Sequence, residues 1–216
     1  MFRNPRDLFQ AYTDGFVGSW CDPEDTDKLL GELPHPLFGV AASDLYSGGK
    51  GKVALLYKSA QKFDPTFGGH ERQTTGDCVS HSTRTAVDVT RCHEITGGQR
   101  EEFVARGATE AIYGSRGHGG QGMSCSVAAR FVHQNGGILL RKDYGFIDLS
   151  KYNSRTGTHW GRSGVPSEVK TEGKKHQVKT ISMIKTVEEA RDALANGYAL
   201  SVCSNYGFSS RRNKNG

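Results

Sequence analysis

The sequence predicts an α+β protein, with helices in the first part of its folded region and strands near the C-terminal end. Small side chains recur at helical spacing over 78–92, which indicates a central helix that its neighbours approach closely. A capping box led by Thr186 begins the clearest helix, which ends before Asn196-Gly197. Apolar runs at 179–184 and 198–203 flank this last helix and predict strands of an antiparallel sheet.

Two further helices are expected between these elements. Apolar residues on one face predict a helix over 100–113 and another over 124–134, which Asn135-Gly136-Gly137 ends in a left-handed turn. Residues 140–178 are rich in Gly, Ser, Lys and Tyr, a composition typical of long loops. Helices are therefore expected mainly before these loops, and strands after them.

The chain divides into an arm and a domain. Residues 1–65 mix aromatic residues, acids and prolines, and we expect them to form an irregular N-terminal arm or leader. Residues 66–216 are expected to form the domain. Within it we expect a helical lobe at about 70–140, the long loops of 140–178 and the start of a sheet lobe at 179–216.

Composition argues against a nucleic-acid-binding protein, a membrane-spanning protein and a disulfide-rich or metal-binding protein. The chain has 216 residues, of which 28 are basic and 23 acidic, and the basic residues are scattered, so no nucleic-acid partner is expected. No apolar run approaches the roughly 18 residues of a membrane-spanning helix, and the first residues lack a secretory signal, so no membrane partner is expected either. The five cysteines include no close pairs, which predicts neither a disulfide framework nor a metal site.

The segment 73–82, Gln-Thr-Thr-Gly-Asp-Cys-Val-Ser-His-Ser, carries the most specific chemical signal. Cys78 lies where a glycine-led turn passes into a helix, and the dipole and unpaired N–H groups of a helix start lower the pKa of a thiol there. The side-chain amide of Gln73 and the backbone N–H of Cys78 are then placed to bind the oxyanion of a tetrahedral intermediate. We therefore interpret Cys78 as a nucleophile and Gln73 as an oxyanion donor.

This segment resembles the Q-G-x-C-G-S-C-W motif of papain-like (C1-type) cysteine peptidases, with Gln73, Gly76 and Cys78 in similar roles. Asp77 and Val79 stand where that family prefers Ser and Trp, and the glutamine lies five residues before the cysteine rather than six. A second block, 119–138, resembles the glycine-rich segment and following helix that line the family's substrate cleft. A third block, 193–202, resembles the segment that precedes the strand bearing the family's catalytic histidine.

The resemblance implies a two-lobed papain-like fold whose central helix starts at Cys78 and whose C-terminal antiparallel sheet is incomplete. It implies hydrolysis of peptide or isopeptide bonds in a protein or peptide substrate, without a cofactor, by Cys78 and Gln73. It also implies substrate-binding roles for Gly76, Asp77, Gly119, Gly120, Gly122 and Met123.

The Asp-Cys-Val-Ser sequence at 77–80 and the segment 110–116 look most like the versions of this family in bacteriophages and prophages. This likeness implies a virion or another protein assembly as a possible partner. Together with the lack of a recognisable signal peptide, it implies a cytoplasmic or virion-associated protein.

The resemblance also implies a catalytic histidine, because a cysteine peptidase needs an imidazole to accept the thiol proton. In the papain order this histidine lies ~130–150 residues beyond the cysteine, but no histidine follows His176 here. Among earlier histidines, His81 is expected to point along the surface of the central helix, and His159 lies in a predicted loop beside a tryptophan. Three explanations stay open: a shortened chain, which the abrupt end at Gly216 favours, a relative that has lost the chemistry, and a site completed by a partner chain.

Three functions follow from these observations. The first is a thiol hydrolase that acts through Cys78. The second is a catalytically inactive structural component of a phage particle or another assembly that keeps the papain-like fold. The third is a cell-wall amidase of the NlpC/P60 type, whose motif also contains an Asp-Cys pair, with His133 at roughly the spacing of its base.

Overall fold

The computed structural model describes most of the chain, and the described part is mostly helical with little strand. The described residues are 38–45, 48–67, 71–100, 102–184 and 186–202. In chain order the helices are α3 (Phe38–Ala41), the 3-10 helix η1 (Ser43–Leu45), α4 (Tyr57–Phe63), α5 (Cys78–Thr96), α6 (Glu110–Gly114), α7 (Cys125–Arg130), the π-helical turn η2 (Phe131–Asn135), α8 (Ser154–Ser163), α9 (Ser167–Gly173), the 3-10 helix η3 (Lys174–His176) and α10 (Val187–Ala195).

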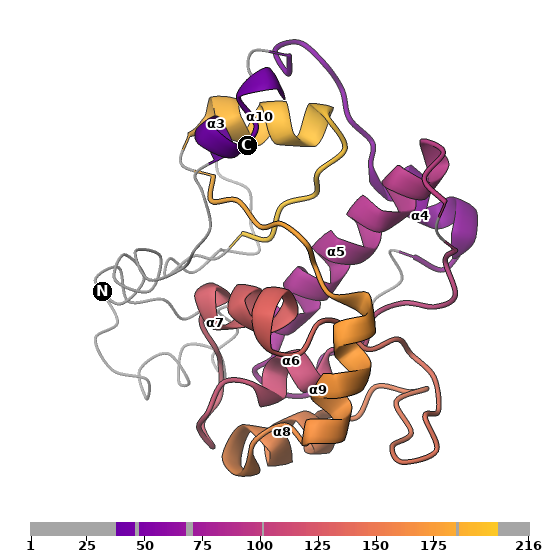
Figure 1. Cartoon of the computed structure of the whole chain (residues 1–216), viewed down its shortest axis with the longest axis vertical. Helices are drawn as coiled ribbons and strands as arrows, with labels where there is room; N and C mark the ends of the chain where they lie inside the picture. Colours follow the sequence, from indigo (N-terminus) through magenta and orange to yellow (C-terminus); the bar gives the residue numbers. More distant parts are fainter. Residues whose placement is uncertain (1–37, 46–47, 68–70, 101, 185, 203–216) are drawn as a thin grey trace, which may run out of the picture.

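Helix α5 crosses the middle of the molecule, with α3 and α10 at one end and α8 and α9 at the other (Figure 1). The prediction of a central helix that starts at Cys78 is confirmed. Its buried face differs from the small side chains predicted to face inward, which were Val79, Thr83, Ala86, Val87 and Thr90. Arg84 and Asp88 are buried, while Ala86 and Val87 are only half-buried. Charged residues therefore form much of the inner face of α5.

The helix predicted over 100–113 is limited to α6. The backbone before it pairs instead with a distant segment: the Ala108 N–H donates to the Leu139 carbonyl (2.6 Å) and the Arg141 N–H to the Arg106 carbonyl (2.7 Å). The N–H of Gly107 donates to the Asp88 carboxylate at 2.9 Å. Because these backbone groups already have partners, the helix begins only at Glu110.

The helix predicted over 124–134 is confirmed as α7 and its continuation η2. The Ser124 hydroxyl accepts the Val127 N–H at 3.3 Å and caps the helix start. Gly137 has a φ of +62°, so the predicted left-handed stop is confirmed at that residue. The chain then runs beside 176–178, where the Ile138 N–H donates to the His176 carbonyl at 3.2 Å.

Two helices, α8 and α9, lie where we expected the long loops of 140–178. The side chain of Asn153 accepts the N–H groups of Arg155 and Thr156 and so caps α8. Helix α8 packs closely on α6, because a Cβ on Gly114 would lie only 2.6 Å from that of Trp160. Gly, Ser and Lys in this stretch therefore belong partly to a tight helix–helix contact, which the composition alone did not indicate.

The helix led by Thr186 is confirmed as α10, with both bonds of its capping box present. The predicted antiparallel sheet is wrong for the described residues, which form helices and loops with isolated bridges such as Gly107–Leu140 and Asp143–Asp148. Residues 198–202 contact α5 instead. The Ala199 N–H donates to the Thr90 hydroxyl at 3.0 Å. Backbone and side chains used in this way are not available for a strand ladder.

The main core gathers apolar side chains from α5 to α9. Val79, Ile112, Ala128, Trp160 and Val169 are among its buried members. Each large apolar side chain removed from water contributes roughly 1.5–3 kcal/mol. This core holds the start of α5 firmly against α6 and α7.

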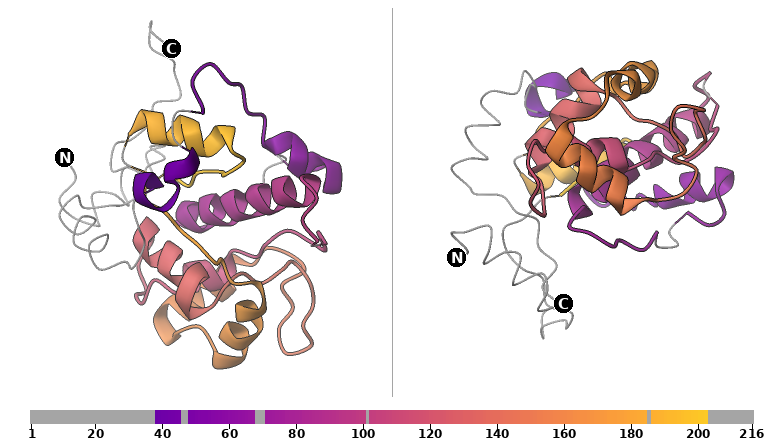
Figure 2. Two further views of the ribbon diagram at one scale, coloured as in Figure 1. Left: turned by 45° about the horizontal axis from the view of Figure 1, so that its top comes forward. Right: turned by 90° about the horizontal axis from the view of Figure 1, so that it is seen from below.

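The described part of the predicted N-terminal arm is attached to the domain. Helix α4 packs on α5, and the Phe38 N–H donates to the Met183 carbonyl at 3.0 Å. In the left-hand view of Figure 2, α3 (indigo) is seen against α10 (yellow). Residues 1–37, which make up the rest of the predicted arm, lie outside the described residues.

Candidate functional site

Cys78 is the first residue of α5 and is half-buried. Burial raises the pKa of its thiol, and the neighbouring Asp77 carboxylate raises it further. Hydrogen bonds from the N–H groups of Val79 and Cys78 and from the Gln73 side chain lower this pKa, but the net shift is upward. The helix start thus acts in the predicted direction, and burial outweighs it.

Gln73 lies beside Cys78, as the motif predicted. Its side-chain amide donates to the Thr75 carbonyl at 2.7 Å, and the same side chain lies close enough to the Cys78 thiol to lower its pKa. An amide NH2 has two donor hydrogens, so one of them stays available while the other bonds Thr75. The structure therefore brings together the two residues predicted to carry the chemistry.

Asp77 lies in the interior rather than on a surface that a substrate would touch. It is 2% exposed, and its Oδ2 accepts the Tyr152 hydroxyl at 2.8 Å. The His81 Nε2 lies 3.4 Å from the same oxygen. Burial and the Asp77 carboxylate raise the pKa of the Tyr152 phenol, which keeps it a hydrogen-bond donor. Asp77 thus fixes the turn before Cys78 through Tyr152.

Gly76 contacts the glycine-rich loop, residues 119–123, directly. The Gly122 N–H donates to the Gly76 carbonyl at 3.1 Å. A Cβ on Gly76 would lie 2.7 Å from the Gln121 Oε1, so a side chain at this position would force the two segments apart. Two of the predicted substrate-binding residues, far apart in sequence, therefore form one wall beside Cys78.

The other residues of the glycine-rich loop are placed differently. Met123 is 1% exposed and belongs to the core. Gly119 and Gly120 are exposed, and the Gly120 carbonyl accepts the Arg116 Nε at 3.0 Å. Arg116 also donates to the Gly157 carbonyl at 3.0 Å, so it holds the loop to α8.

Gln121 is a site residue that the sequence analysis did not identify. Its Oε1 accepts the Gly76 N–H, the Thr75 hydroxyl (2.8 Å) and the Tyr113 hydroxyl (3.2 Å). One side-chain oxygen thus joins the turn before Cys78 to the glycine-rich loop and to α6. A polar residue inside a run of glycines was the available signal.

In the part of the chain that the structure describes, the histidines considered as candidates do not supply an obvious base. Both ring nitrogens of His81 face side chains of its own helix region, with Nε2 toward Asp77 and Nδ1 3.4 Å from an Arg84 nitrogen. This agrees with a side chain directed along the helix. His159 lies on α8 and not in the predicted loop. The Nδ1 of His133 lies 2.8 Å from the Val178 carbonyl, so this ring is also engaged.

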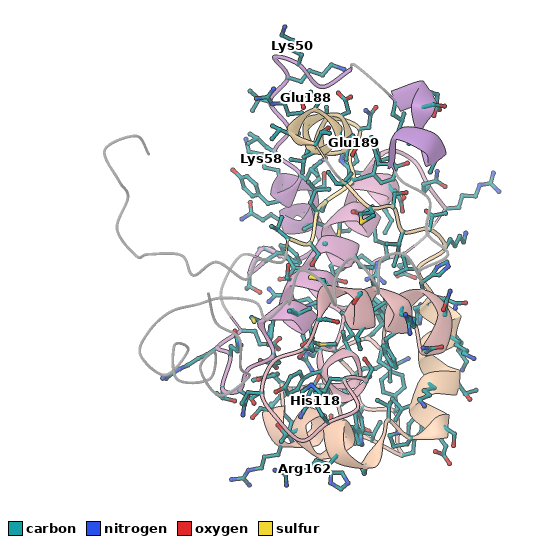
Figure 3. All side chains as sticks on the ribbon, turned by 90° about the vertical axis from the view of Figure 1, so that its left-hand side faces the viewer. Lys50, Lys58, His118, Arg162, Glu188 and Glu189 are labelled. Carbon is teal, nitrogen blue, oxygen red and sulfur yellow. The ribbon has the colours of Figure 1, made fainter. Side chains whose placement is uncertain are left out.

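His118 is the histidine closest in sequence to the glycine-rich loop. Figure 3 shows it at the same end of the molecule as Arg162 and far from Glu188. Its Nδ1 accepts the Gly120 N–H at 3.2 Å. Burial and the nearby Arg116 lower the pKa of His118, so its ring is neutral at pH 7.

A network of ion pairs holds the segment that precedes Cys78. Arg141 bridges two carboxylates, Glu71 at 3.1 Å and the buried Glu110 at 2.6 Å. Glu71 also pairs with Arg84 of α5 at 3.2 Å, and the Asn153 N–H donates to Glu110 at 2.7 Å. The segment that leads to Cys78 is therefore tied to α5, α6 and the start of α8.

The remaining cysteines have structural surroundings. Cys92 is fully buried, and burial raises its pKa to about 11. Cys125 is disulfide-bonded and also packs against the main core. Within the described ranges, no group of three or more His, Cys, Asp or Glu side chains is arranged to hold a metal ion. None of the helices described is both long and apolar enough to cross a membrane.

Comparison with known proteins gives little further information. No known protein family matches the sequence, and no curated protein does. Among solved structures, the chain is similar to Xylellain, a cysteine protease from Xylella fastidiosa, with a TM-score of 0.40 and 16% identity over 57% of this chain. The matched region spans 47% of the Xylellain chain. This TM-score is too low to establish a common fold.

Proposed function

We propose that this chain is a papain-like thiol hydrolase that cleaves a peptide or isopeptide bond through Cys78. The observation that carries the proposal is the placement of Cys78 at the start of α5, with the Gln73 side chain close enough to the thiol to lower its pKa. That pairing supplies a nucleophile and a fixed donor at one point.

In the proposed reaction, the Cys78 thiolate attacks the substrate carbonyl and forms a tetrahedral intermediate. The Cys78 N–H and the Gln73 amide bind its oxyanion. The amine then leaves with a proton, and water hydrolyses the resulting thioester. Gly122 would lie along the substrate, with the buried Gly76, Asp77 and Met123 holding it from the interior.

The proposal requires a base, because the raised pKa of Cys78 leaves its thiol protonated at pH 7. His81 faces Asp77 and Arg84, so we do not assign it this role. We assign the base to a histidine supplied by a continuation of the chain or by a partner chain. An imidazole there would accept the thiol proton and later protonate the leaving amine.

The test is selective labelling of the full chain with iodoacetamide, followed by mass spectrometry of each cysteine. We expect Cys78 to be modified well before Cys92, which is buried and has a pKa of about 11. Gln73→Ala should slow labelling of Cys78 and leave Cys92 unchanged. Labelling of Cys78 no faster than of Cys92 would contradict the proposal, as would peptide cleavage that survives Cys78→Ala.

A second candidate is a papain-like scaffold without catalysis, and the raised pKa of Cys78 favours it. Such a protein would bind a virion or another protein assembly equally well as wild type and as Cys78→Ala. A cleavage activity that depends on Cys78 would exclude it. A bacteriophage origin and a cytoplasmic or virion-associated location stay predictions.

A further inference from the structure

A groove of about 690 Å³ runs along α5 beyond Cys78. Its volume lies within the range of roughly 300–1,000 Å³ that ligand sites occupy. Gln73 forms part of its lining, so the groove adjoins the candidate active site. Neither the proposed reaction nor the motif resemblance assigns a function to it.

The lining carries more positive than negative charge. Arg72, Arg84 and Arg106 contribute guanidinium groups to it, against the single carboxylate of Glu71. That carboxylate is already shared by Arg84 and by Arg141 behind it. Glu71 is therefore neutralised by its own neighbours and does not oppose an anion in the groove.

Arg72 and Arg106 differ in how they are held. Arg106 forms an ion pair with Asp64. Arg72 is exposed, and no ion pair or hydrogen bond of its side chain occurs among the described residues. A carboxylate entering the groove would therefore meet an uncompensated cation at Arg72.

Arg84 adds a buried donor to the same wall. Its side chain is 7% exposed, and its Nε has no hydrogen-bond partner within the described part of the chain. Burial lowers the pKa of Arg84, the Asp88 and Glu71 carboxylates raise it, and the positive charges of Arg141 and Arg106 lower it. A bound carboxylate would give this Nε the acceptor that it lacks.

Part of the remaining lining is apolar. Phe67 and Val89 are 6% and 7% exposed, and Ala86 and Leu200 complete this surface. An apolar side chain of a ligand could lie on it. Single-stranded nucleic acid needs exposed aromatic rings on which its bases stack. Among the described residues that line the groove, Phe67 carries a phenyl ring, and this ring is buried. The lining therefore favours a peptide.

We propose that this groove binds an acidic stretch of a peptide, with a carboxylate on Arg72 and Arg84 and an adjacent apolar side chain on Val89. The assignment of that peptide as a substrate rests on the proposed function, since the groove begins at Gln73. The binding itself needs no nucleophile.

The experiment uses the full chain with Cys78→Ala, so that nothing is cleaved. The probe is a fluorescein-labelled hexapeptide of leucine and glutamate, and its partner peptide carries glutamine in place of each glutamate. We expect the acidic peptide to bind about tenfold more tightly, as measured by fluorescence anisotropy, because a charge-assisted bond replaces a neutral one. Raising the salt concentration should weaken this preference.

Adding Arg72→Gln should remove the preference, whereas Arg191→Gln, which removes the same charge from the exposed surface of α10, should leave it intact. Equal affinity for the two peptides, or no binding of either, would overturn the proposal. Tighter binding of a single-stranded oligonucleotide than of the acidic peptide would overturn it as well. Failure of cysteine labelling would count against the hydrolase alone, because these affinities are measured without Cys78.

Discussion

The ionisation of one thiol governs what this molecule can do chemically. Burial and Asp77 raise the pKa of Cys78 above its ordinary value of 9.0. Since the thiolate is the reactive form, the rate of Cys78 alkylation should still be rising at pH 9, with no plateau near neutrality. Mass spectrometry of iodoacetamide-treated protein across a pH series would measure this. A plateau near pH 7 would show that a cationic group stabilises the thiolate.

The three hydrogen bonds to the Gln121 oxygen can be tested by substitution. Gln121→Leu leaves donors from Thr75, Gly76 and Tyr113 facing an apolar side chain, all three residues being buried. We expect the free energy of unfolding to fall by about 1–3 kcal/mol in urea titrations, the cost of unsatisfied buried donors. Gln121→Glu keeps an acceptor oxygen and is the matched control. A loss just as large for both variants would show that the acceptor is not what matters.

Residues close in sequence were the ones that the motif could place. The pairing of Gln73 with Cys78 follows from a turn of five residues and a helix start, so local sequence contains it. The burial of Asp77 depends on Tyr152, which lies 75 residues away. No local pattern contains that contact, so sequence reasoning put Asp77 at the surface.

Helix α10 offers a test at the scale of one element. Its capping box joins the Thr186 hydroxyl to the Glu189 N–H at 3.1 Å. Thr186→Ala should lower the free energy of unfolding by about 1 kcal/mol, because the N–H loses its partner. Thr186→Ser keeps the hydroxyl and should change little in the same thermal or urea measurement. Equal effects of both substitutions would contradict the capping explanation.

Elements defined by local signals were predictable, and those defined by tertiary contacts were not. The starts of α5, α7 and α10 follow from a glycine-led turn, a serine cap and a capping box. Helix α8 was missed because the glycines that suggested a loop, such as Gly157, permit its close packing on α6. The predicted sheet failed because residues 198–202 bond to α5 rather than to another strand.

For the molecule as a whole, the buried charges connect segments that the apolar core leaves separate. Glu110 is 1% exposed and pairs with Arg141, which also holds Glu71 ahead of Cys78. Glu110→Ala would leave the buried Arg141 with Glu71 as its remaining carboxylate partner. We therefore expect the free energy of unfolding to fall by about 3–5 kcal/mol. Calorimetry against Glu110→Gln, which keeps an acceptor oxygen, would measure it. If Glu110→Ala lowered the free energy of unfolding by less than Glu110→Gln does, the stabilising role of this ion pair would be contradicted.

The shared oxygen of Gln121 has a consequence for local motion. The amide of Gly76 is bonded to Gln121, and the amide of Gly122 is bonded back to Gly76. If these two segments separated, both amides would lose their hydrogen bonds at once. The protection of both amides against hydrogen–deuterium exchange should therefore rise and fall together. Water would then reach the turn before Cys78 through one cooperative opening rather than two independent fluctuations.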